Sequence, residues 1–326
     1  MNWLTTCGGL GIMRHVNFVI LTAYCALLAA FSIYFLLDTF VIERVYSAEG
    51  SACEQAGSVS QAADATEQDS TGPQTVNTAL TETTVTKDTY QDENISIKIT
   101  EYRTNRTTVY AADIQLSSAG YLKTALAKGL YGRNVTARTS VTAAENDAIL
   151  AINGDYYGSQ QKGYVIRNGV LYRSTAVKGN RDLVIYEDGS FGIISEEDIS
   201  AEQLLADGAV QVLSFGPAIV EDGEITVSSS YEVGKAMASN PRTAIGIIDD
   251  LHYVFVVSDG RTSESEGLSV RELAELMKGL GVKTAYNLDG GGSSTMWFNG
   301  SIVNKPTSNG RTISERSVSD IVYIGY

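Results

Sequence analysis

The chain has 326 residues and carries 38 Asp and Glu against 24 Lys and Arg, so its net charge is −14 and nonspecific nucleic-acid binding is excluded. It contains three cysteines, all before residue 54, and two histidines, His15 and His252. A disulfide framework and a multi-histidine metal site are therefore excluded for the part of the chain after residue 54. A Ser-His-Asp triad would have to use His252. This histidine lies in an expected strand, so we interpret it as structural.

An uncharged apolar run covers residues 16–37 and is long enough to span a bilayer. We predict a cytoplasmic leader over 1–15 and a signal-anchor over 16–37 that crosses the lipid bilayer once. Arg14 precedes the run, which favours an N-terminus inside and a catalytic part outside the cytoplasm. A cleaved signal peptide is the alternative.

Residues 47–90 are rich in Ser, Thr, Ala, Gln and acidic residues, and Lys87 is their one basic residue. They show no apolar periodicity, so they bury too little surface to offset the entropy of ordering. We predict a flexible extracytoplasmic linker over 38–91 and a catalytic domain over 92–326.

Alternating and continuous apolar runs predict strands in the first half of this domain, at 95–99, 107–116 and 148–152, with a short helix at 139–146. Asn168-Gly169, Asp188-Gly189 and Asp222-Gly223 predict tight turns, the first two within β-hairpins. A helix is expected at 196–206 and a strand at 210–215.

Two further strands, 244–248 and 251–258, precede a capping box formed by Ser269 and Glu272, which predicts the start of a helix. A strand at 284–288 follows that helix. Strand, helix and strand predict a right-handed crossover between two parallel neighbours, with Asp259 and Asp289 at one sheet edge. We expect an α+β (mixed α/β) fold, in which a mixed β-sheet packs with a few helices and β-hairpins.

Polar side chains gather where these strands end. The sets are Asn153 with Asp155, Arg242 with Thr243, Asp259 with Arg261, Asp289 with three glycines and two serines, and Glu315 with Arg316. Three consecutive glycines permit a sharp turn or close approach to a ligand, and their amides suit an anion such as phosphate. The alternative for the glycine run is a tight turn capped by Asp289.

Taken in order, these motifs resemble the phosphodiester glycosidases, a family that includes the uncovering enzyme, which removes N-acetylglucosamine from a sugar-phosphate diester, and bacterial exopolysaccharide-biosynthesis relatives. The resemblance covers roughly residues 148–326. Its pieces are Asn153 to Tyr157, Pro241 to Gly246, Asp259 to Arg261, the helix start at 268–276, and Asn287 to Ser294. Glu315-Arg316-Ser317-Val318 matches the family's closing Glu-Arg-Pro-Val except at Ser317, and Asp155 stands where many members have glycine.

The resemblance implies hydrolysis of a sugar-1-phosphodiester at the anomeric carbon, on cell-envelope or exopolysaccharide glycans. We assign Asp289 as nucleophile or as base for water, with Asp259 or Asp155 as its partner. Guanidinium groups bind phosphate bidentately, so the arginines are assigned to it. The expected substrate-binding residues are Asn153, Arg242, Thr243, Arg261, Asn287, Gly290, Gly291, Gly292, Ser293, Ser294, Glu315 and Arg316.

Other functions stay open at this point. Asp155, Asp259 and Asp289 could be oxygen ligands of a divalent-metal phosphodiesterase. The same arginines could serve a non-catalytic module that binds anionic wall polymers, or the glycine loop could only close a turn. The predicted hydrolase requires no cofactor, although a divalent cation such as calcium is left open, as is oligomerisation.

Overall fold

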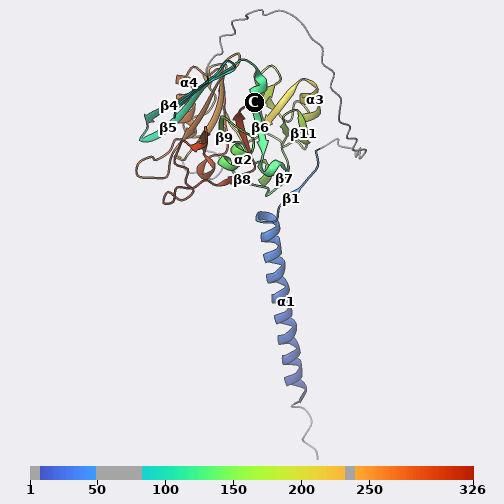
Figure 1. The fold of residues 1–326 in the computed structure, drawn as a ribbon. Coiled ribbons are helices and arrows are strands. Elements are labelled where there is room, and N and C mark those ends of the chain that lie inside the picture. Colours follow the sequence, from blue (N-terminus) through green and yellow to red (C-terminus); the bar gives the residue numbers. More distant parts are fainter. Residues whose placement is uncertain (1–7, 49–82, 232–238) are drawn as a thin grey trace, which may run out of the picture.

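Antiparallel sheets and a few short helices make up the folded body of the protein (Figure 1). The structure, a computed structural model, describes residues 8–48, 83–231 and 239–326. Every strand pair in these ranges is antiparallel, so the expected α+β class holds in outline while the expected mixed sheet is wrong.

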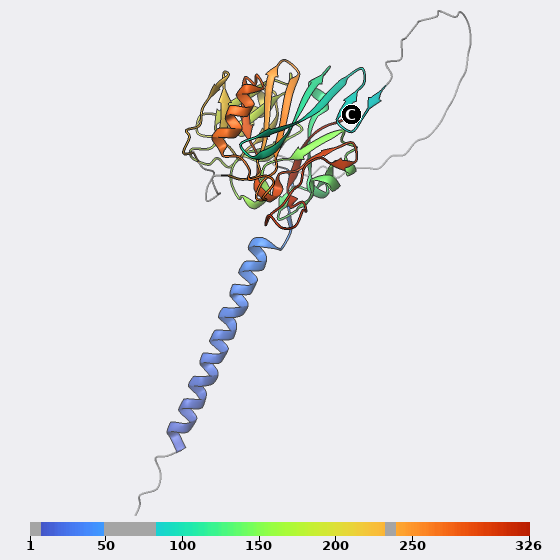
Figure 2. The same ribbon diagram turned by 90° about the vertical axis from the view of Figure 1, so that its left-hand side faces the viewer.

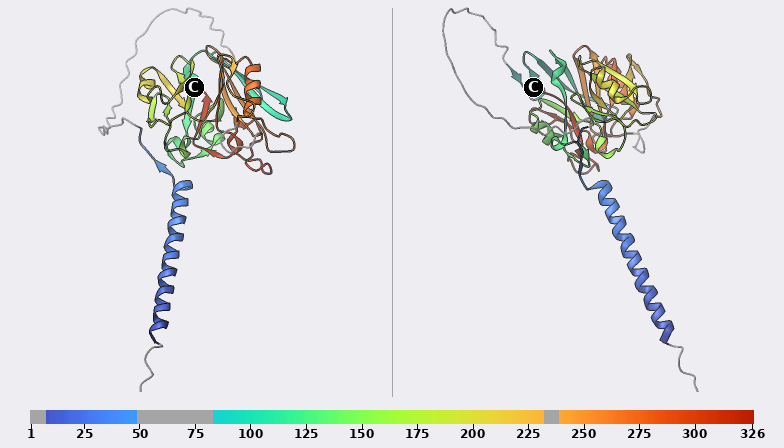
Figure 3. Two further views of the ribbon diagram at one scale, coloured as in Figure 1. Left: turned by 180° about the vertical axis from the view of Figure 1, so that it is seen from behind. Right: turned by 90° about the vertical axis from the view of Figure 1, so that its right-hand side faces the viewer.

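Helix α1 (Gly8–Phe40) projects away from the body in each view (Figures 1, 2 and 3). Its segment Leu21–Thr39 is apolar and long enough to cross a membrane by length and composition, and none of that segment is buried against the protein. Strand β1 (Arg44–Val45) follows and pairs with β7 (Gly132–Arg133). Most of the predicted linker, residues 49–82, lies outside the described ranges.

The largest sheet has nine strands. In spatial order they are β16 (Glu224–Ile225), β15 (Ala218–Glu221), β19 (Thr284–Asn287), β17 (Thr243–Asp249), β18 (His252–Ser258), β5 (Thr107–Leu116), β4 (Ile95–Thr104), β3 (Thr89–Gln91) and β2 (Thr84–Val85). β2 and β3 fall within the predicted linker. The sheet therefore begins before residue 92, and the expected boundary is too late because these short edge strands carry no apolar pattern.

Two five-stranded sheets complete the body. One contains β21 (Ser301–Ile302), β20 (Met296–Phe298), β9 (Leu150–Asn153), β23 (Asp320–Ile324) and β6 (Leu122–Leu126). The other contains β11 (Val170–Arg173), β10 (Val165–Arg167), β14 (Ala209–Leu213), β12 (Arg181–Tyr186) and β13 (Phe191–Ser195). A small pair, β8 (Ala137–Arg138) with β22 (Ser317–Val318), lies beside them.

The main core lies between one face of the nine-stranded sheet and the two five-stranded sheets, and all three contribute to it, as with Ile97, Val322 and Leu183. Helix α4 (Val270–Gly279) covers the other face through Leu273 and Met277. Helix α2 (Thr139–Glu145) packs on the sheet of β9, and α3 (Ala201–Ala206) on that of β10. Apolar burial on both faces makes the nine-stranded sheet the rigid support of the site.

The local turn and cap signals are confirmed. Asn168 and Gly169 both have positive φ, 49° and 75°, as the type I′ turn of the β10–β11 hairpin requires. The capping box at the start of α4 is present, with the Ser269 hydroxyl accepting from the Glu272 amide. His252 pairs with Asp113 on the neighbouring strand, at 3.1 Å, which agrees with its structural interpretation.

Two expectations about longer segments are wrong. β18 and β19 run parallel to each other but are not neighbours, because β17 lies between them and pairs with both. The α4 crossover thus passes over one strand. Helix α3 begins only at Ala201, because the Ser200 side chain caps it while Glu196, expected in the same helix, is buried in hydrogen bonds to other segments.

A buried pair of carboxyl groups joins Asp182 on β12 to Glu196. Glu196 accepts from the Tyr164 amide at 3.1 Å and from the Asn180 side chain at 3.2 Å. Burial, and next the hydrogen bond and charge of Glu196, raise the pKa of Asp182 to about 9. Asp182 is therefore the protonated member and donates to Glu196 at neutral pH.

This pair makes the protein less stable as the pH rises from about 4 to about 9. In that window the unfolded chain ionises Asp182 while the folded protein keeps it protonated, so folding must retain a proton that solvent would remove. The substitution Asp182→Asn removes this titration and keeps a donor to Glu196. We expect urea unfolding of the variant to show a flatter decline in stability between pH 5 and pH 9.

The matched control is Asp250→Asn, in the exposed turn between β17 and β18, which should keep the wild-type slope. An unchanged slope in Asp182→Asn would show that Asp182 is ionised in the folded protein.

Candidate active site

Three segments meet at one edge of the nine-stranded sheet because their strands alternate in direction. β17 begins at Thr243, between the ends of β18 and β19, so residue 242 lies between the segments that carry Asp259 and Asp289. The chains are tightly packed there: the Leu288 amide donates to the Thr243 carbonyl at 2.9 Å, and a Cβ added to Gly290 would lie 2.9 Å from the Pro241 carbonyl oxygen. The segments that carry Asp259 and Asp289 thus meet at one sheet edge, as expected. The strand order differs from the expected one, because β17 lies between β18 and β19.

Asn153, at the end of β9, joins the second sheet to this edge. Its side-chain amide donates to the Asp289 carbonyl at 2.7 Å, and its side-chain oxygen accepts from the Thr243 hydroxyl at 2.8 Å and the Thr295 amide at 3.2 Å. Asn153 and Thr243 are both fully buried. In this geometry they position Asp289 and do not reach a ligand.

Asp289 is partly buried, and its Oδ1 accepts from the Gly290 amide at 2.9 Å. Burial raises the pKa of its carboxyl above the ordinary value, and the charge of Asp155 adds to this. The Ser293 hydroxyl, the Arg316 guanidinium and the Gly290 amide act in the opposite direction. The result is a carboxylate that binds a proton more readily than an exposed Asp, as a base requires.

The glycine run lets two guanidinium groups approach the loop after Asp289. Gly291 has φ of 63°, and a Cβ there would lie 2.8 Å from Arg261 Nη2. A Cβ on Gly292 would lie 3.0 Å from Arg316 Nη2 and 2.1 Å from the Ser308 hydroxyl. Any larger residue would displace these side chains, which explains glycine at both positions.

Arg261 and Arg316 are neighbours of like charge. Arg261 donates to the Asn240 side-chain oxygen at 3.0 and 3.1 Å and to the Ser308 carbonyl at 2.7 Å, while the exposed Arg316 guanidinium makes no hydrogen bond to the described residues. Burial, and next the charge of Arg316, lower the pKa of Arg261. Neither side chain forms an ion pair in the described ranges, so their positive charge is available to an anion.

The three glycine amides contribute less than expected. The Gly290 amide is engaged by Asp289 and the Gly291 amide by the Pro241 carbonyl at 2.8 Å. Only the Gly292 amide is without an acceptor among the described residues. Of the three backbone donors expected for an anion, one therefore remains. The other donors to an anion would come from the two arginines.

Asp155 is bound within a buried ion triad. Its carboxylate accepts from Arg167 at 2.8 Å and from the Tyr157 and Ser214 amides at 2.9 Å, and Arg167 also donates to Asp320 at 2.8 Å. Burial raises the pKa of Asp320 to about 8, because one guanidinium cannot neutralise both carboxylates. Asp155 therefore acts on Asp289 through its charge.

An aromatic pair, Tyr156 and Phe215, includes a ring close enough to Asp289 to feel its charge. Tyr156 is partly buried and packs edge-on against Phe215, with ring centroids 4.9 Å apart. Burial, and next the charges of Asp289 and Asp155, raise the pKa of Tyr156, so its hydroxyl stays protonated. A neutral aromatic wall beside a carboxylate suits a sugar ring.

Four other predicted residues face elsewhere. Asp259 accepts from the Lys305 amide at 2.8 Å and makes no contact with Asp289 among the described residues. Arg242 is buried, and its Nε donates to the Leu268 carbonyl at 2.9 Å, ahead of α4. Glu315 accepts from the Ser140 amide at 2.9 Å in the first turn of α2, and the Asn287 side-chain nitrogen donates to the Gly216 carbonyl at 2.8 Å. These contacts support the site's framework.

Ser293 and Ser294 are both fully buried beneath the glycine loop. Of the two, Ser293 interacts with Asp289 and lowers the pKa of its carboxyl. The predicted contacts of these serines with substrate stay predictions, and Ser293 is the nearer to the carboxylate.

The sequence interpretation missed the residues that complete this arrangement, namely Arg167, Asp320, Asn240, Ser308, Asn304, Tyr156 and Phe215. Tyr156 lies inside the Asn153 to Tyr157 motif, so the sequence did contain a pattern that could have identified it. Arg167 lies in a hairpin and Asp320 inside an apolar strand, and neither position shows a local pattern that distinguishes it from a surface charge.

The metal alternative requires Asp155, Asp259 and Asp289 to face one point. Asp155 is turned to Arg167, whereas Asp259 is held by the Lys305 amide. Within residues 8–48, 83–231 and 239–326, no three His, Cys, Asp or Glu side chains are grouped so that they could hold a metal ion. The three aspartates thus do not form the set of oxygen ligands that this alternative requires.

Comparisons with known proteins relate the chain to one family. A family model described as "Phosphodiester glycosidase" matches residues 146–325. The "SPbeta prophage-derived uncharacterized protein YomE" of Bacillus subtilis is 29% identical over 189 residues, which are 56% of this chain and 29% of that protein. Mouse N-acetylglucosamine-1-phosphodiester alpha-N-acetylglucosaminidase is 29% identical over 181 residues, 51% of this chain and 35% of that enzyme.

The chain therefore spans about a third of the length of these curated relatives. Among solved structures, the zebrafish N-acetylglucosamine-1-phosphodiester alpha-N-acetylglucosaminidase catalytic domain, auto-inhibited by its pro-peptide, has a TM-score of 0.56. It is 24% identical, and the similarity covers 71% of this chain and 83% of that one. At this identity the likeness shows the fold alone.

Proposed function

This chain belongs to the phosphodiester glycosidase family, and we propose that it is a hydrolase that cleaves a sugar-1-phosphodiester at the glycosidic bond. The products are a free sugar and a phosphate monoester. The observation that carries the proposal is the position of Arg261 and Arg316 against the glycine loop that follows Asp289. An anion recognised by the two guanidiniums would lie next to that carboxylate.

The arrangement suits a leaving group that is already an anion. In the proposed reaction the bond between the anomeric carbon and the phosphate oxygen breaks, and the phosphate keeps the electron pair. Arg261, Arg316 and the Gly292 amide would stabilise this charge, so little help from a general acid is needed. Asp155 is saturated with hydrogen bonds and is not required as a proton donor.

Asp289 is the proposed partner of the sugar. It would act as nucleophile or as the base that takes a proton from water while the water oxygen bonds to the anomeric carbon. Both roles need the ionised form. Because burial raises the pKa of Asp289, activity should fall on acidification at a higher pH than for an exposed aspartate.

We also propose that residues 16–37 anchor the protein in the cell membrane, with residues 1–15 inside, a linker that ends before β2, and the catalytic domain outside. The apolar segment of α1 supports this by its length and composition. The substrate would then be a cell-envelope or exopolysaccharide glycan that carries a phosphodiester.

The test is hydrolysis in oxygen-18 water by the full chain in detergent micelles, beginning with N-acetylglucosamine-1-phosphodiesters. Label in the released sugar is expected, because water attacks carbon. Label in the phosphate would instead indicate cleavage of a P–O bond, as by a metal phosphodiesterase. Saturable binding without turnover of any diester would favour a non-catalytic module.

Removal of the Arg316 side chain should weaken substrate recognition without unfolding the protein. Its guanidinium makes no hydrogen bond to the described residues, so Arg316→Ala should leave the melting temperature unchanged. We expect kcat/KM to fall roughly tenfold to a hundredfold, the usual effect of losing one hydrogen bond to a charged group. Because Arg316 lowers the pKa of Asp289, the acidic limb of the pH–rate profile should also move to higher pH.

Arg271→Ala is the matched control. It removes a half-buried arginine of α4 that pairs with Glu275 and donates to the Val227 carbonyl, and it should leave both kcat/KM and its pH profile unchanged. Equal losses in the two variants would indicate a general effect of net charge, and the assignment of Arg316 to phosphate would be withdrawn.

A further inference from the structure

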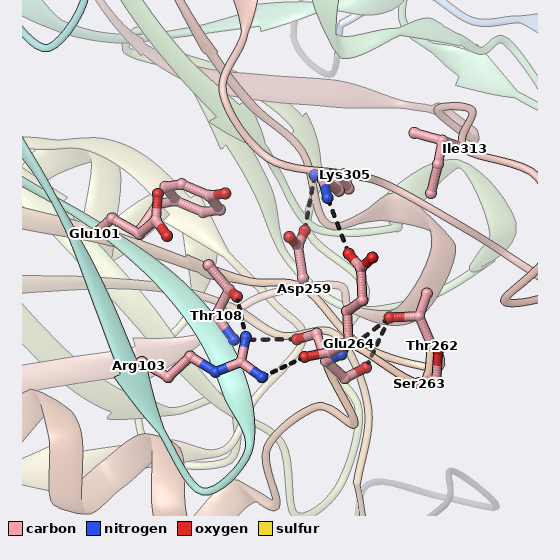
Figure 4. A pocket seen from close by; sticks show the side chains of 11 residues that line it. Glu101, Arg103, Thr108, Asp259, Thr262, Ser263, Glu264, Lys305 and Ile313 are labelled. Carbon is pink, nitrogen blue, oxygen red and sulfur yellow. Dashed lines mark hydrogen bonds and ion pairs between the residues drawn. The ribbon is translucent and has the colours of Figure 1, made fainter.

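A cavity of about 630 Å³ has Asp259 in its wall (Figure 4). Its walls come from β4, β5 and two loops, residues 259–267 and 303–316. This size is within the roughly 300–1,000 Å³ typical of small-molecule sites. Its lining is polar, with Tyr110 and Ile313 as the apolar surfaces.

The β4–β5 hairpin forms this cavity where one face of the sheet changes character. The inner face of β4 begins as Ile95, Ile97 and Ile99 in the core and continues as Glu101 and Arg103 in the cavity. On β5 the same face passes from Ile114 and Ala112 to Tyr110 and Thr108. The face is therefore polar only where loops, and not a second sheet, lie opposite.

Asp259 lies at the base of the cavity and is only 5% exposed. Its Oδ1 accepts from the Asn304 side chain at 3.2 Å and the Lys305 amide at 2.8 Å, which hold the carboxylate in place. Its Oδ2 accepts no hydrogen bond from the described residues. This oxygen is therefore held in place at the cavity and is open to a donor from a ligand.

The charges around the cavity favour a neutral ligand. Arg103 already donates to the Thr108 hydroxyl at 3.0 Å and the Glu264 carbonyl at 2.6 Å, and Lys305 pairs with the Glu264 carboxylate at 3.0 Å. Glu101 has no such partner in the described ranges. The basic groups are thus engaged and the acceptors are open, which disfavours a phosphate and favours hydroxyl donors.

Tyr110 adds a flat surface and a donor. Burial, and next the charges of Asp259 and Glu101, raise the pKa of Tyr110 to about 12, so its phenol keeps its proton. An aromatic face beside carboxylates that accept from hydroxyls is the chemistry of sugar recognition.

Both loops also form the wall of the proposed active site. Arg261 follows Asp259 by two residues, but its φ of 62° directs it to the opposite side, where it donates to the Ser308 carbonyl. In the second loop, Lys305 and Ile313 line the cavity while Arg316 approaches the glycine run. Asn304 links the cavity to the glycine loop, because its side-chain amide donates to Asp259 Oδ1 at 3.2 Å and to the Ser294 carbonyl at 3.0 Å.

We propose that this cavity is a subsite for a neutral sugar residue of the substrate, on the far side of the phosphate from the bond that breaks. This inference rests on the proposed function for the identity of the substrate. Asp259, Glu101 and Tyr110 would accept from or donate to the sugar hydroxyls, and the chain of an envelope glycan would continue outward over Ile313.

The direct test is calorimetric titration of neutral trisaccharides, such as chitotriose and maltotriose, into the full-length Asp289→Asn protein in micelles. We expect one of the panel to bind, with affinity reduced roughly tenfold by a further Asp259→Asn, Glu101→Gln or Tyr110→Phe change, the effect of one lost hydrogen bond. Tyr102→Phe is the matched control, because Tyr102 lies on the opposite face of β4 and should leave binding unchanged.

Absence of binding across the panel, equal binding in all variants, or binding of calcium or spermidine in place of the sugars would overturn the subsite. A second measurement compares diesters that carry a methyl group or a trisaccharide beyond the phosphate. We expect a preference in kcat/KM for the trisaccharide, reduced roughly tenfold by Tyr110→Phe and retained by Tyr102→Phe. If no diester is hydrolysed the proposed function fails, whereas hydrolysis without any preference overturns only the subsite.

Discussion

Replacement of Asp289 by asparagine should lower kcat on a sugar-1-phosphodiester on the order of 10³-fold or more, the range found when a catalytic acid or base is removed. Asparagine keeps an oxygen for the Gly290 amide, so the loop should stay in place. Burial raises the pKa of Asp289, which means that the folded protein disfavours its charge. The variant should therefore be at least as stable as the wild type at neutral pH.

The measurements are kcat by release of sugar and the melting temperature of the same preparations. Asp113→Asn serves as a matched control, because Asp113 is exposed on β5 and pairs with His252, so the variant should keep full activity. Full retained activity in Asp289→Asn would remove this residue from the mechanism, and the configuration of the first-formed sugar, followed by NMR, distinguishes a nucleophile from a base.

Replacement of Arg167 by methionine should destabilise the fold by about 3–5 kcal/mol, because two buried carboxylates lose their shared counter-ion. Arg167 is 2% exposed and donates to both Asp155 and Asp320. The loss should be larger at pH 8 than at pH 5, since protonation relieves the repulsion between Asp155 and Asp320 at the lower pH. Denaturant unfolding at both pH values measures it.

Arg181→Met is the matched control, because Arg181 forms a comparable pair with Glu221 at the surface and its loss should change stability by less than about 1 kcal/mol. The triple change Asp155→Asn, Arg167→Met and Asp320→Asn should recover much of the lost stability, since no buried charge remains. Similar losses for Arg167→Met and Arg181→Met would show that the triad is hydrated.

Local patterns predicted most of the elements near the site. The turn of the β10–β11 hairpin and the capping box of α4 each involve residues within a few positions of one another. Their geometry can therefore be predicted from neighbouring residues. The alternation in β4 and β5 likewise follows from one buried face. These signals need no knowledge of what packs opposite.

Local sequence patterns do not show which strands are neighbours in a sheet. β17, β18 and β19 are all apolar on both faces, so nothing in their patterns tells which lies in the middle. Pairing is decided by long-range contacts with the second sheet and with α4. The sequence predicted one sheet edge for Asp259 and Asp289 correctly and assigned both side chains to one site, whereas Asp259 lines the cavity beside β4 and β5.

By itself, the sequence determined the family motifs, an apolar run long enough to span a bilayer and the strand ends where polar residues gather, because each depends on residues close together in the chain. Only the tertiary structure decided that Asp155 is neutralised by Arg167, that Arg242 supports α4, and that Arg261 and Arg316 face the glycine loop. The direction of a charged side chain depends on partners from distant segments. Those partners cannot be identified from the residues that neighbour it in the sequence.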